Sequence, residues 1–344
     1  LWECLVADTT AEPAAGSLAA VLDGSAGQVM VEIPVFSVRH WCEPSGSHTR
    51  HQFSLLPGVV NGGDYTVHPA FLKPDGSCRR HIYIGAYQAT GANSDGSASG
   101  VNNTVQKTFT AVRAACAARG AGWHQLGYWS YNALQWLVIC EYQDLNSKRV
   151  LGYGASSLAG MNPKAQVHTG LSDGAGNGCG HHHTLPEDAD GTEKIHDYLS
   201  YRGIENPYGR ARQWLDGVNV YLLDVYVSNN PADWQQRTTA KYSWLGTLPP
   251  TYTFLENGNP LAYHLFQRDL NPGIGLLPSS CEQGSATTYL AEALETTTEN
   301  PTPNEYWDGW TILDVGGMAW MGERNGIWNR CFASDTSNYW YVGG

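Results

Sequence analysis

The residue types best suited to metal chemistry gather in one stretch, NGCGHHHTLPED (177–188). Cysteine thiolates and histidine imidazoles are zinc ligands. Three consecutive histidines cannot all face one ion without a special turn, and no second ligand pair stands at zinc-finger spacing. A transition-metal site and an exposed or capping loop are both open readings, and we favour the loop. The potential ligands are Cys179, His181, His182, His183, Glu187 and Asp188.

Catalytic motifs that spacing alone would reveal are absent from the sequence. It has no G-x-S-x-G elbow, no H-E-x-x-H helix and no phosphate-binding G-x-x-x-x-G-K-[ST]. Carboxylates such as Asp216, Asp224, Glu256 and Asp314 occur, but no sequence rule brings two of them together as an acid/base pair. We therefore predict that the chain is not an enzyme and assign no catalytic residue.

The C-terminal segment 314–344, DVGGMAWMGERNGIWNRCFASDTSNYWYVGG, combines glycines with large aromatic and hydrogen-bonding side chains. These side chains keep neither the two-residue period of a strand nor the 3.6-residue period of a helix for long. Glycine allows sharp turns, and Trp, Tyr and Arg carry much of the binding energy at recognition surfaces. The segment is either a compact recognition loop or a final β-hairpin whose aromatic residues fill the core.

Composition excludes several classes of partner. The net charge of −12, from 20 basic and 32 acidic residues, argues against nucleic acid or an anionic membrane surface. The longest apolar run, around 134–140, is too short to insert across a bilayer. The eight cysteines are scattered without a C-x-x-C pair, which is typical of a protein folded in a reducing cytoplasm. Because Leu1 is not an initiating methionine, we expect the chain to be a piece of something longer.

Local patterns predict the elements that position these residues. Apolar alternation indicates strands at 28–39, with a bend at Pro34, and at 81–89. Thr108 as N-cap and Gly120 as C′ residue delimit a first helix.

A second, largely buried helix is expected over 130–145, with Ser130 as its cap and Leu134, Leu137, Val138 and Glu141 covering its circumference. Apolar residues alternate again at 218–224. The spans 151–197 and 228–303 lack periodicity and are predicted to be long irregular excursions.

The stretch 200–221, SYRGIENPYGRARQWLDGVNVY, resembles the central signature of the C-type-lectin fold as formylglycine-generating-enzyme-like and phage proteins build it. There a tryptophan packs into the centre of the domain and an Asp-Gly pair follows. Segment 27–38 resembles the opening strand of the phage members, and 108–154 resembles their two-helix segment. Segment 315–344 resembles the ligand-facing end of tail-fibre and receptor-binding proteins, which a diversity-generating retroelement rewrites in some relatives.

The resemblance implies an α+β, C-type-lectin-like fold with a small twisted antiparallel sheet, two flanking helices and long loop insertions. Residues 1–27 would be an entry segment, and 28–344 one domain with insertions at about 155–197 and 228–303. The implied scaffold residues are Gly209, Trp214, Asp216, Gly217, Gly316, Gly317, Gly322, Gly326, Trp328 and Gly343. The implied ligand-binding residues are Trp320, Met321, Glu323, Arg324, Arg330, Phe332, Asp335, Asn338, Tyr339 and Trp340.

The function implied is that of a phage virion surface protein, made in the bacterial cytoplasm, that binds a host-surface carbohydrate or protein receptor. Other virion proteins would be its further partners, and tail fibres suggest a homo-oligomer, a trimer by analogy. One alternative is a structural virion component, either a capsid decoration or a fibre module, whose C-terminal aromatic residues pack against neighbouring subunits. A remote alternative is an enzyme of the formylglycine-generating type, although Cys331 has no evident partner cysteine. No cofactor is expected. Lectin-like domains often bind calcium, and Glu205, Asn206 and Asp216 offer either oxygen ligands or turn and helix-capping hydrogen bonds.

Overall fold

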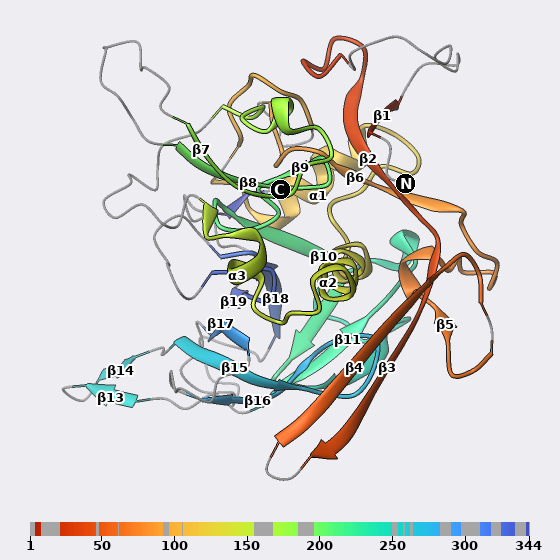
Figure 1. The fold of residues 1–344 in the computed structure, drawn as a ribbon, viewed down its shortest axis with the longest axis vertical. Coiled ribbons are helices and arrows are strands. Elements are labelled where there is room, and N and C mark those ends of the chain that lie inside the picture. Colours follow the sequence, from red (N-terminus) through yellow and green to blue (C-terminus); the bar gives the residue numbers. More distant parts are fainter. Residues whose placement is uncertain are drawn as a thin grey trace.

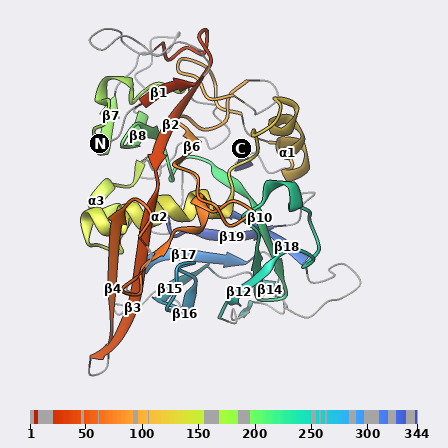
Figure 2. The same ribbon diagram turned by 90° about the vertical axis from the view of Figure 1, so that its right-hand side faces the viewer.

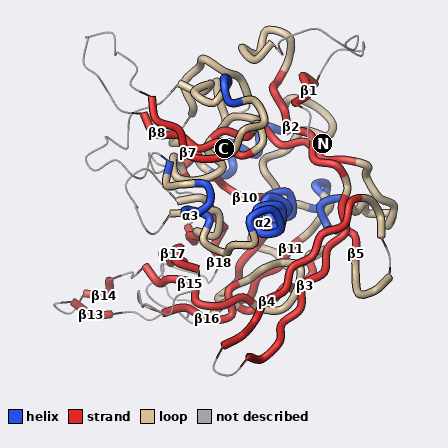
Figure 3. Tube along the Cα trace, in the orientation of Figure 1, coloured by secondary structure: helices blue, strands red, loops and turns tan. Residues whose placement is uncertain are grey.

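A computed structural model describes residues 4–7, 21–45, 48–60, 62–91, 96–104, 106–154, 168–184, 196–249, 254–256, 259–261, 264–282, 290–296, 310–317, 325–333 and 342–343. This part of the chain mixes few helices with many strands, mostly antiparallel, as an α+β protein does (Figure 3). No helix in it is long and apolar enough to cross a bilayer. The helices are α1 (Phe109–Ala118), α2 (Tyr128–Tyr142) and α3 (Ser147–Leu151), with 3-10 turns η1 (Pro69–Phe71), η3 (Asp173–Ala175) and η4 (Pro231–Asp233).

The largest sheet holds nine strands, so the small sheet that we expected is wrong in size. Its main path is β12 (Ser243–Thr247), β11 (Asp224–Val227), β10 (Arg212–Tyr221), β18 (Trp310–Val315), β19 (Arg330–Ala333), β17 (Leu290–Thr296), β15 (His264–Leu270) and β16 (Pro278–Glu282), and β20 (Val342–Gly343) pairs with β10. Neighbours are antiparallel except for β17 with β19 and β10 with β20. The C-terminal strands therefore lie in the middle of the sheet.

Four smaller sheets complete the described strands. They are β1 (Cys4–Ala7) with β2 (Gln28–Pro34) and β6 (His81–Gly85); β4 (His48–Pro57) with β3 (Phe36–Ser45) and β5 (Thr66–Val67); β7 (Gly180–Thr184) with β8 (His196–Tyr201) and β9 (Ile204–Glu205); and β13 (Phe254–Glu256) with β14 (Asn259–Leu261). Helix α2 lies near the middle of the molecule in both ribbon views, and the long β3–β4 hairpin passes below it (Figures 1 and 2).

The first predicted strand is two strands, because the chain changes sheets beside Pro34. Val29, Val31 and Ile33 alternate into the core along β2, as expected. Proline has no backbone N–H to donate to a ladder. Val35 then donates its own N–H to the carbonyl oxygen of Arg80 (2.8 Å), and β3 pairs with β4 instead of β6.

The first predicted helix is confirmed as α1. The Thr108 side chain accepts a hydrogen bond from the backbone N–H of Ala111 (3.3 Å), which caps the first turn. Phe109 and Val112 are buried on one face. Gly120, just past the helix end, adopts φ of 117°, as a C′ glycine does.

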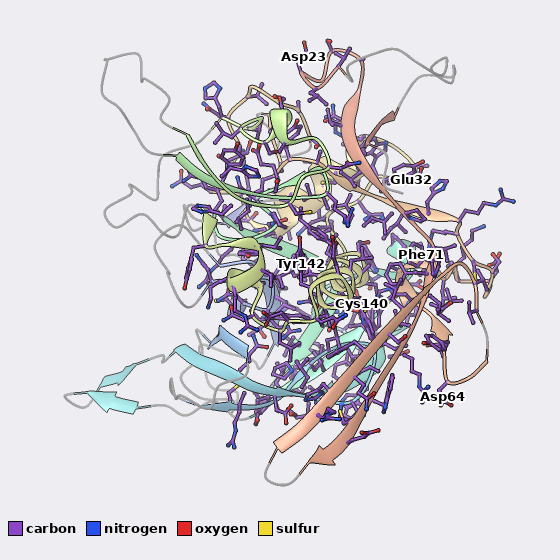
Figure 4. All side chains as sticks on the ribbon, viewed as in Figure 1. Asp23, Glu32, Asp64, Phe71, Cys140 and Tyr142 are labelled. Carbon is purple, nitrogen blue, oxygen red and sulfur yellow. The ribbon has the colours of Figure 1, made fainter. Side chains whose placement is uncertain are left out.

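The second predicted helix is confirmed, but its cap is wrong. Helix α2 begins at Tyr128 after Gly127, which provides no side-chain cap, so Ser130 lies in the first turn. Gln143 ends the helix in the left-handed region, with φ of 54°. Side chains on nearly every face of the helix are buried, so α2 is the central element of the core. Cys140 and Tyr142, near its C-terminal end, are labelled in Figure 4. Glu141 is the exception, being exposed and paired with Arg202.

The two predicted irregular excursions contain regular structure. Strand β7 lies within 151–197, and strands β12 to β17 lie within 228–303. Their partners are often other strands of the same excursion, as in the pairs β15–β16 and β15–β17. Pairing of this kind stabilises a strand without a clean alternation of apolar and polar residues, which is why the pattern missed it. The strand predicted at 218–224 also breaks at Leu222, which turns with φ of 57°.

Candidate functional site

The tryptophan of the lectin-like signature anchors helix α1 to the large sheet. Trp214 on β10 is fully buried, and its indole Nε1 donates to the carbonyl oxygen of Lys107 (3.0 Å). Its ring meets Phe109 edge to face, with centroids 6.1 Å apart. Trp214 therefore joins β10 to the start of α1 through one hydrogen bond and one ring contact.

Asp216, two residues on, ties the same strand to α1 and to the α1–α2 link. Its carboxylate accepts two hydrogen bonds from Arg113, from Nε (2.6 Å) and from an Nη atom (2.5 Å). Its backbone N–H donates to the carbonyl oxygen of Leu126 (2.9 Å). Only 1% of Asp216 is exposed, so the paired guanidinium is what makes a buried carboxylate tolerable.

Gly217 is required because an indole lies against its backbone. It adopts φ of 69°, and a Cβ there would lie 2.6 Å from Trp234 Cε2 and 2.9 Å from the carbonyl oxygen of Ser228. A Cβ on Gly127 would lie 2.7 Å from Cη2 of the same indole. Trp234 is held in this position by donating its Nε1 to Ser228 O (3.0 Å).

The glycines that open the C-terminal segment form a tight junction with Gly209. Gly209 donates its N–H to the carbonyl oxygen of Gly316 (2.7 Å), and a Cβ on Gly209 would lie 2.8 Å from Tyr153 O. Gly317 has φ of 66°, and a Cβ there would lie 1.8 Å from Asn325 Oδ1. Residues 317 and 325 are therefore in close contact, and a side chain at 317 would require a strained φ and a shift of Asn325.

Residues 325–331, which follow close to this junction, are buried. Trp328 is fully buried, and Gln267 Nε2 donates to its carbonyl oxygen. Ile327 is held from both sides: its carbonyl accepts from Gln135 Nε2 on α2 (2.9 Å), and its N–H donates to Ser147 Oγ on α3 (3.1 Å). Gly326 adopts φ of 143° at the start of this turn. These contacts hold the turn that carries Gly326, Ile327 and Trp328 against α2, α3 and β15.

Arg330 corrects one expectation. We predicted a displayed ligand-binding side chain, but only 2% of it is exposed. Its Nη atoms donate to Gln267 Oε1 (2.7 Å) and to the carbonyl oxygen of Leu276 (2.9 Å). The guanidinium fastens β19 to the β15–β16 turn, because its fork of donors can satisfy carbonyls that would otherwise be buried without partners. Arginine is a common recognition residue, which is why the sequence suggested ligand binding for Arg330. Its burial depends on which strands lie next to β19, and the sequence does not reveal these partners.

The other predicted ligand-binding residues lie in, or next to, two segments between described elements. The first is 318–324, which follows Gly317 and precedes Asn325. The second is 334–341, which follows β19 and precedes β20; Val342 there pairs with Arg212 of β10. Phe332 lies on β19, and Gly343 on β20 pairs with Gln213. Outside the described residues are Trp320, Met321, Gly322, Glu323, Arg324, Asp335, Asn338, Tyr339 and Trp340.

Sequence reasoning missed a buried ion pair between neighbouring strands β10 and β18. Arg212 and Asp314 are 4% and 1% exposed at their side chains, with Nη1 and Oδ1 3.6 Å apart. Burial raises the pKa of Asp314 to about 7, against the lowering effect of Arg212. The only sign in the sequence was an aspartate at the end of the apolar strand TILDV, and that gave no indication of its partner.

The histidine-rich stretch is a strand and not the loop we favoured. His181 and His182 lie on β7, where successive side chains point to opposite faces, so adjacent histidines cannot share one ion. His182 stacks on Tyr198, with ring centroids 4.9 Å apart, and its Nε2 lies 2.9 Å from Ser200 Oγ. Glu187 and Asp188 lie outside the described residues.

The carboxylates considered for calcium are engaged with protein groups. The Glu205 carboxylate accepts from Ser172 N (2.8 Å), Ser172 Oγ (2.9 Å) and Gly170 N (3.2 Å), and Asp216 binds Arg113. Asn206 Oδ1 accepts from the backbone N–H of Leu199 (3.0 Å). Most of these contacts join residues more than thirty positions apart, so they are neither calcium ligation nor the turn and helix-capping hydrogen bonds of the alternative reading.

A pocket of about 380 Å³ also escaped sequence reasoning. It lies between β6, the start of α2 and the segment around η4. Trp123, Trp129 and Trp234 contribute aromatic faces to its wall, and Arg79 and His81 contribute polar groups.

Comparison with known proteins adds no relative to this picture. No protein-family model matches the chain, and no curated protein matches it. The function must therefore be inferred from the residues and their geometry.

Proposed function

We propose that the chain is a phage virion surface protein, at a tail-fibre or appendage tip, with a C-type-lectin-like domain that binds a host receptor through its C-terminal segment. The lectin-like reading is supported by the buried Trp214, by Asp216 and Gly217, and by the α1 helix that they hold. Trp214 and Asp216 are buried and hold α1 against β10, and Gly217 leaves room for the Trp234 indole, which supports a scaffold role for this stretch.

The observation that carries the proposal is that segments 318–324 and 334–341 both start and end on fixed residues. Gly317 contacts Asn325, which closes the first segment at its base. Strands β19 and β20 flank the second, each paired within the large sheet. Segments with rigid ends can vary in side chain without unfolding the domain, which is how recognition loops are usually built. Their Trp, Tyr and Arg content suits a carbohydrate or protein receptor.

A structural role in the virion is the second candidate, and one side chain favours it. Trp244 is 61% exposed on β12, the strand at one end of the large sheet. An edge strand with an exposed aromatic side chain is a ready surface for a neighbouring subunit.

An enzymatic role is the least supported reading. Only 1% of Cys331, the cysteine nearest the C-terminus, is exposed. A nucleophile needs contact with its substrate, so we propose that Cys331→Ser leaves the function of the particle intact.

The two main readings are separated by paired sets of alanine variants in whole particles. Changing Trp320, Arg324 and Tyr339 together should abolish adsorption to host cells while particles still assemble. The matched control changes Trp244, Arg80 and Tyr83, which lie outside the C-terminal segment and are exposed. It should leave adsorption unchanged. If the control set blocks assembly while the first set leaves adsorption intact, the protein is a structural component.

A further inference from the structure

The β3–β4 hairpin brings together three side chains that are all ligands for soft or borderline metals. His40 and Cys42 are two residues apart on β3 and so share a face of the strand. Cys42 lies directly opposite His51 in the β3–β4 register. These three form the one group of potential metal ligands found in the described part of the chain.

Their ligand atoms converge at the spacing of a metal site. His40 Nε2 and His51 Nδ1 are 3.1 Å apart, and Cys42 Sγ lies 3.2 Å from His51 Nδ1 and 3.8 Å from His40 Nε2. Around a tetrahedral zinc ion, with Zn–N near 2.0–2.1 Å and Zn–S near 2.3 Å, ligand atoms are separated by about 3.3 Å for N–N and about 3.6 Å for N–S. The N–N distance and one N–S distance are slightly shorter than these values, and the other N–S distance is slightly longer.

The far side of each imidazole is held as it is in metal proteins. His51 Nε2 contacts the Asp269 carboxylate on β15, and an ionised carboxylate can only accept, so Nε2 carries the proton and Nδ1 presents its lone pair. His40 Nδ1 contacts two backbone groups of Gly273, the carbonyl oxygen at 3.0 Å and the N–H at 3.2 Å. In the tautomer that binds a metal, Nδ1–H donates to the carbonyl oxygen and Nε2 presents its lone pair to the ion. A second hydrogen bond to carboxylate or carbonyl is the usual support of a metal-bound histidine.

Packing fixes the rings further. Phe53 stacks on His40 with ring centroids 4.5 Å apart and planes 13° from parallel. Trp136 of α2 meets His40 edge-on, at 6.2 Å. The His51 side chain is 8% exposed and Asp269 is 26% exposed, so the group lies at the border of core and solvent. An ion could enter from solvent, and the ligands would not need to move far.

We propose that His40 Nε2, Cys42 Sγ and His51 Nδ1 bind one zinc ion, with water in the fourth position. Zinc accepts this nitrogen and sulfur set in tetrahedral geometry. The site would fasten the β3–β4 hairpin to the large sheet, since its supporting groups, Asp269 and Gly273, belong to β15 and the turn that follows it (Figures 1 and 2). The competing arrangement is a metal-free trio, in which His40 Nε2–H donates to His51 Nδ1.

Metal content of the full chain tests the proposal directly. The protein is produced in zinc-supplemented medium, desalted, and analysed by inductively coupled plasma mass spectrometry; we expect close to one zinc per chain. Cys42→Ser should lose most of it. Cys78→Ser is the matched control, because Cys78 is also a half-buried free thiol, and should keep it.

Replacing zinc with Co²⁺ identifies the ligand atoms from the absorption spectrum, even in a variant that binds the metal weakly. Co²⁺ bound by the wild type and by Cys78→Ser should show a thiolate-to-cobalt charge-transfer band, which Cys42→Ser lacks while circular dichroism shows it folded. Asp269→Asn keeps all three ligands but should weaken zinc binding about 10- to 100-fold. Equal zinc content in wild type and Cys42→Ser, or none in either, would overturn the proposal in favour of the hydrogen-bonded trio. A stoichiometric copper ion with intense visible absorption would overturn the assignment to zinc.

Discussion

At the scale of single residues, the buried pair of Arg212 and Asp314 bears directly on how the C-terminal segment is held. Asp314 pairs with Cys331 of β19 on one side and with Trp214 of β10 on the other. Burial disfavours its charged form and raises its pKa to about 7, from an ordinary value of 3.8. Between these values the native protein binds more protons than the unfolded chain, so stability must fall as the pH rises.

Asp314→Asn should remove this pH dependence. The stabilising contribution of the protonated Asp314 is full below about pH 4 and is lost as the pH rises through about 7. The free energy of unfolding of the wild type, relative to the variant, should therefore decrease across this window, by a few kcal/mol at most. Urea unfolding at a series of pH values measures it. Asp64→Asn, whose side chain is 80% exposed, is the control and should leave the profile unchanged. A constant difference between wild type and Asp314→Asn would contradict the assignment.

At the scale of elements, β10 organises its neighbours through backbone closeness as much as through side chains. Trp214 and Asp216 hold α1, and Gly217 lets the Trp234 indole lie against the strand. A glycine can be required because its φ is left-handed or because a side chain would clash with neighbouring atoms. Comparing Gly217 with a second glycine separates these two effects. Gly76 also has positive φ, of 80°, but a Cβ there would meet nothing within 4 Å.

Gly217→Ala should destabilise the protein more than Gly76→Ala. In both variants the left-handed backbone conformation of the alanine destabilises the folded state by about 1–2 kcal/mol. Only Gly217→Ala also forces Trp234 or Ser228 to move, and overpacking of this kind costs a further ~1–3 kcal/mol. The free energies of unfolding from urea titration give the comparison. Equal losses in the two variants would mean that Trp234 shifts without cost and that glycine is needed at 217 for its φ alone.

At the scale of the whole molecule, helix α2 contacts both the β3–β4 hairpin and the large sheet. Phe53 on β4 contacts Trp136 of α2, and Trp136 Nε1 in turn donates to the carbonyl oxygen of Ile274 in the β15–β16 turn (2.8 Å). The proposed zinc site lies beside this contact. An ion bound there would couple the β3–β4 hairpin to the large sheet, which contains the C-terminal strands β18, β19 and β20.

Zinc should therefore raise the melting temperature of the full chain, and a chelator should lower it. A ligand that binds only the folded state at 100 times its dissociation constant stabilises by about 2.7 kcal/mol. Differential scanning calorimetry of the wild type with zinc and with EDTA measures the shift, and Cys42→Ser should show almost none. An equal response in Cys42→Ser would place the stabilising ion elsewhere.

The sequence by itself determined the features that depend on neighbours a few residues away. The cap at Thr108, the end of α1 at Gly120, the alternation along β2 and the burial of α2 all follow from periods and caps within one element, and all are found. Only the tertiary structure decided which elements meet. It buried Arg330 under a turn more than fifty residues away in sequence, made a strand of the histidine stretch, and set Asp269 against His51 across 218 positions. The physical reason is that helix periods and caps are local, whereas the pairing of strands and the meeting of side chains across sheets depend on long-range contacts that no short window of sequence contains.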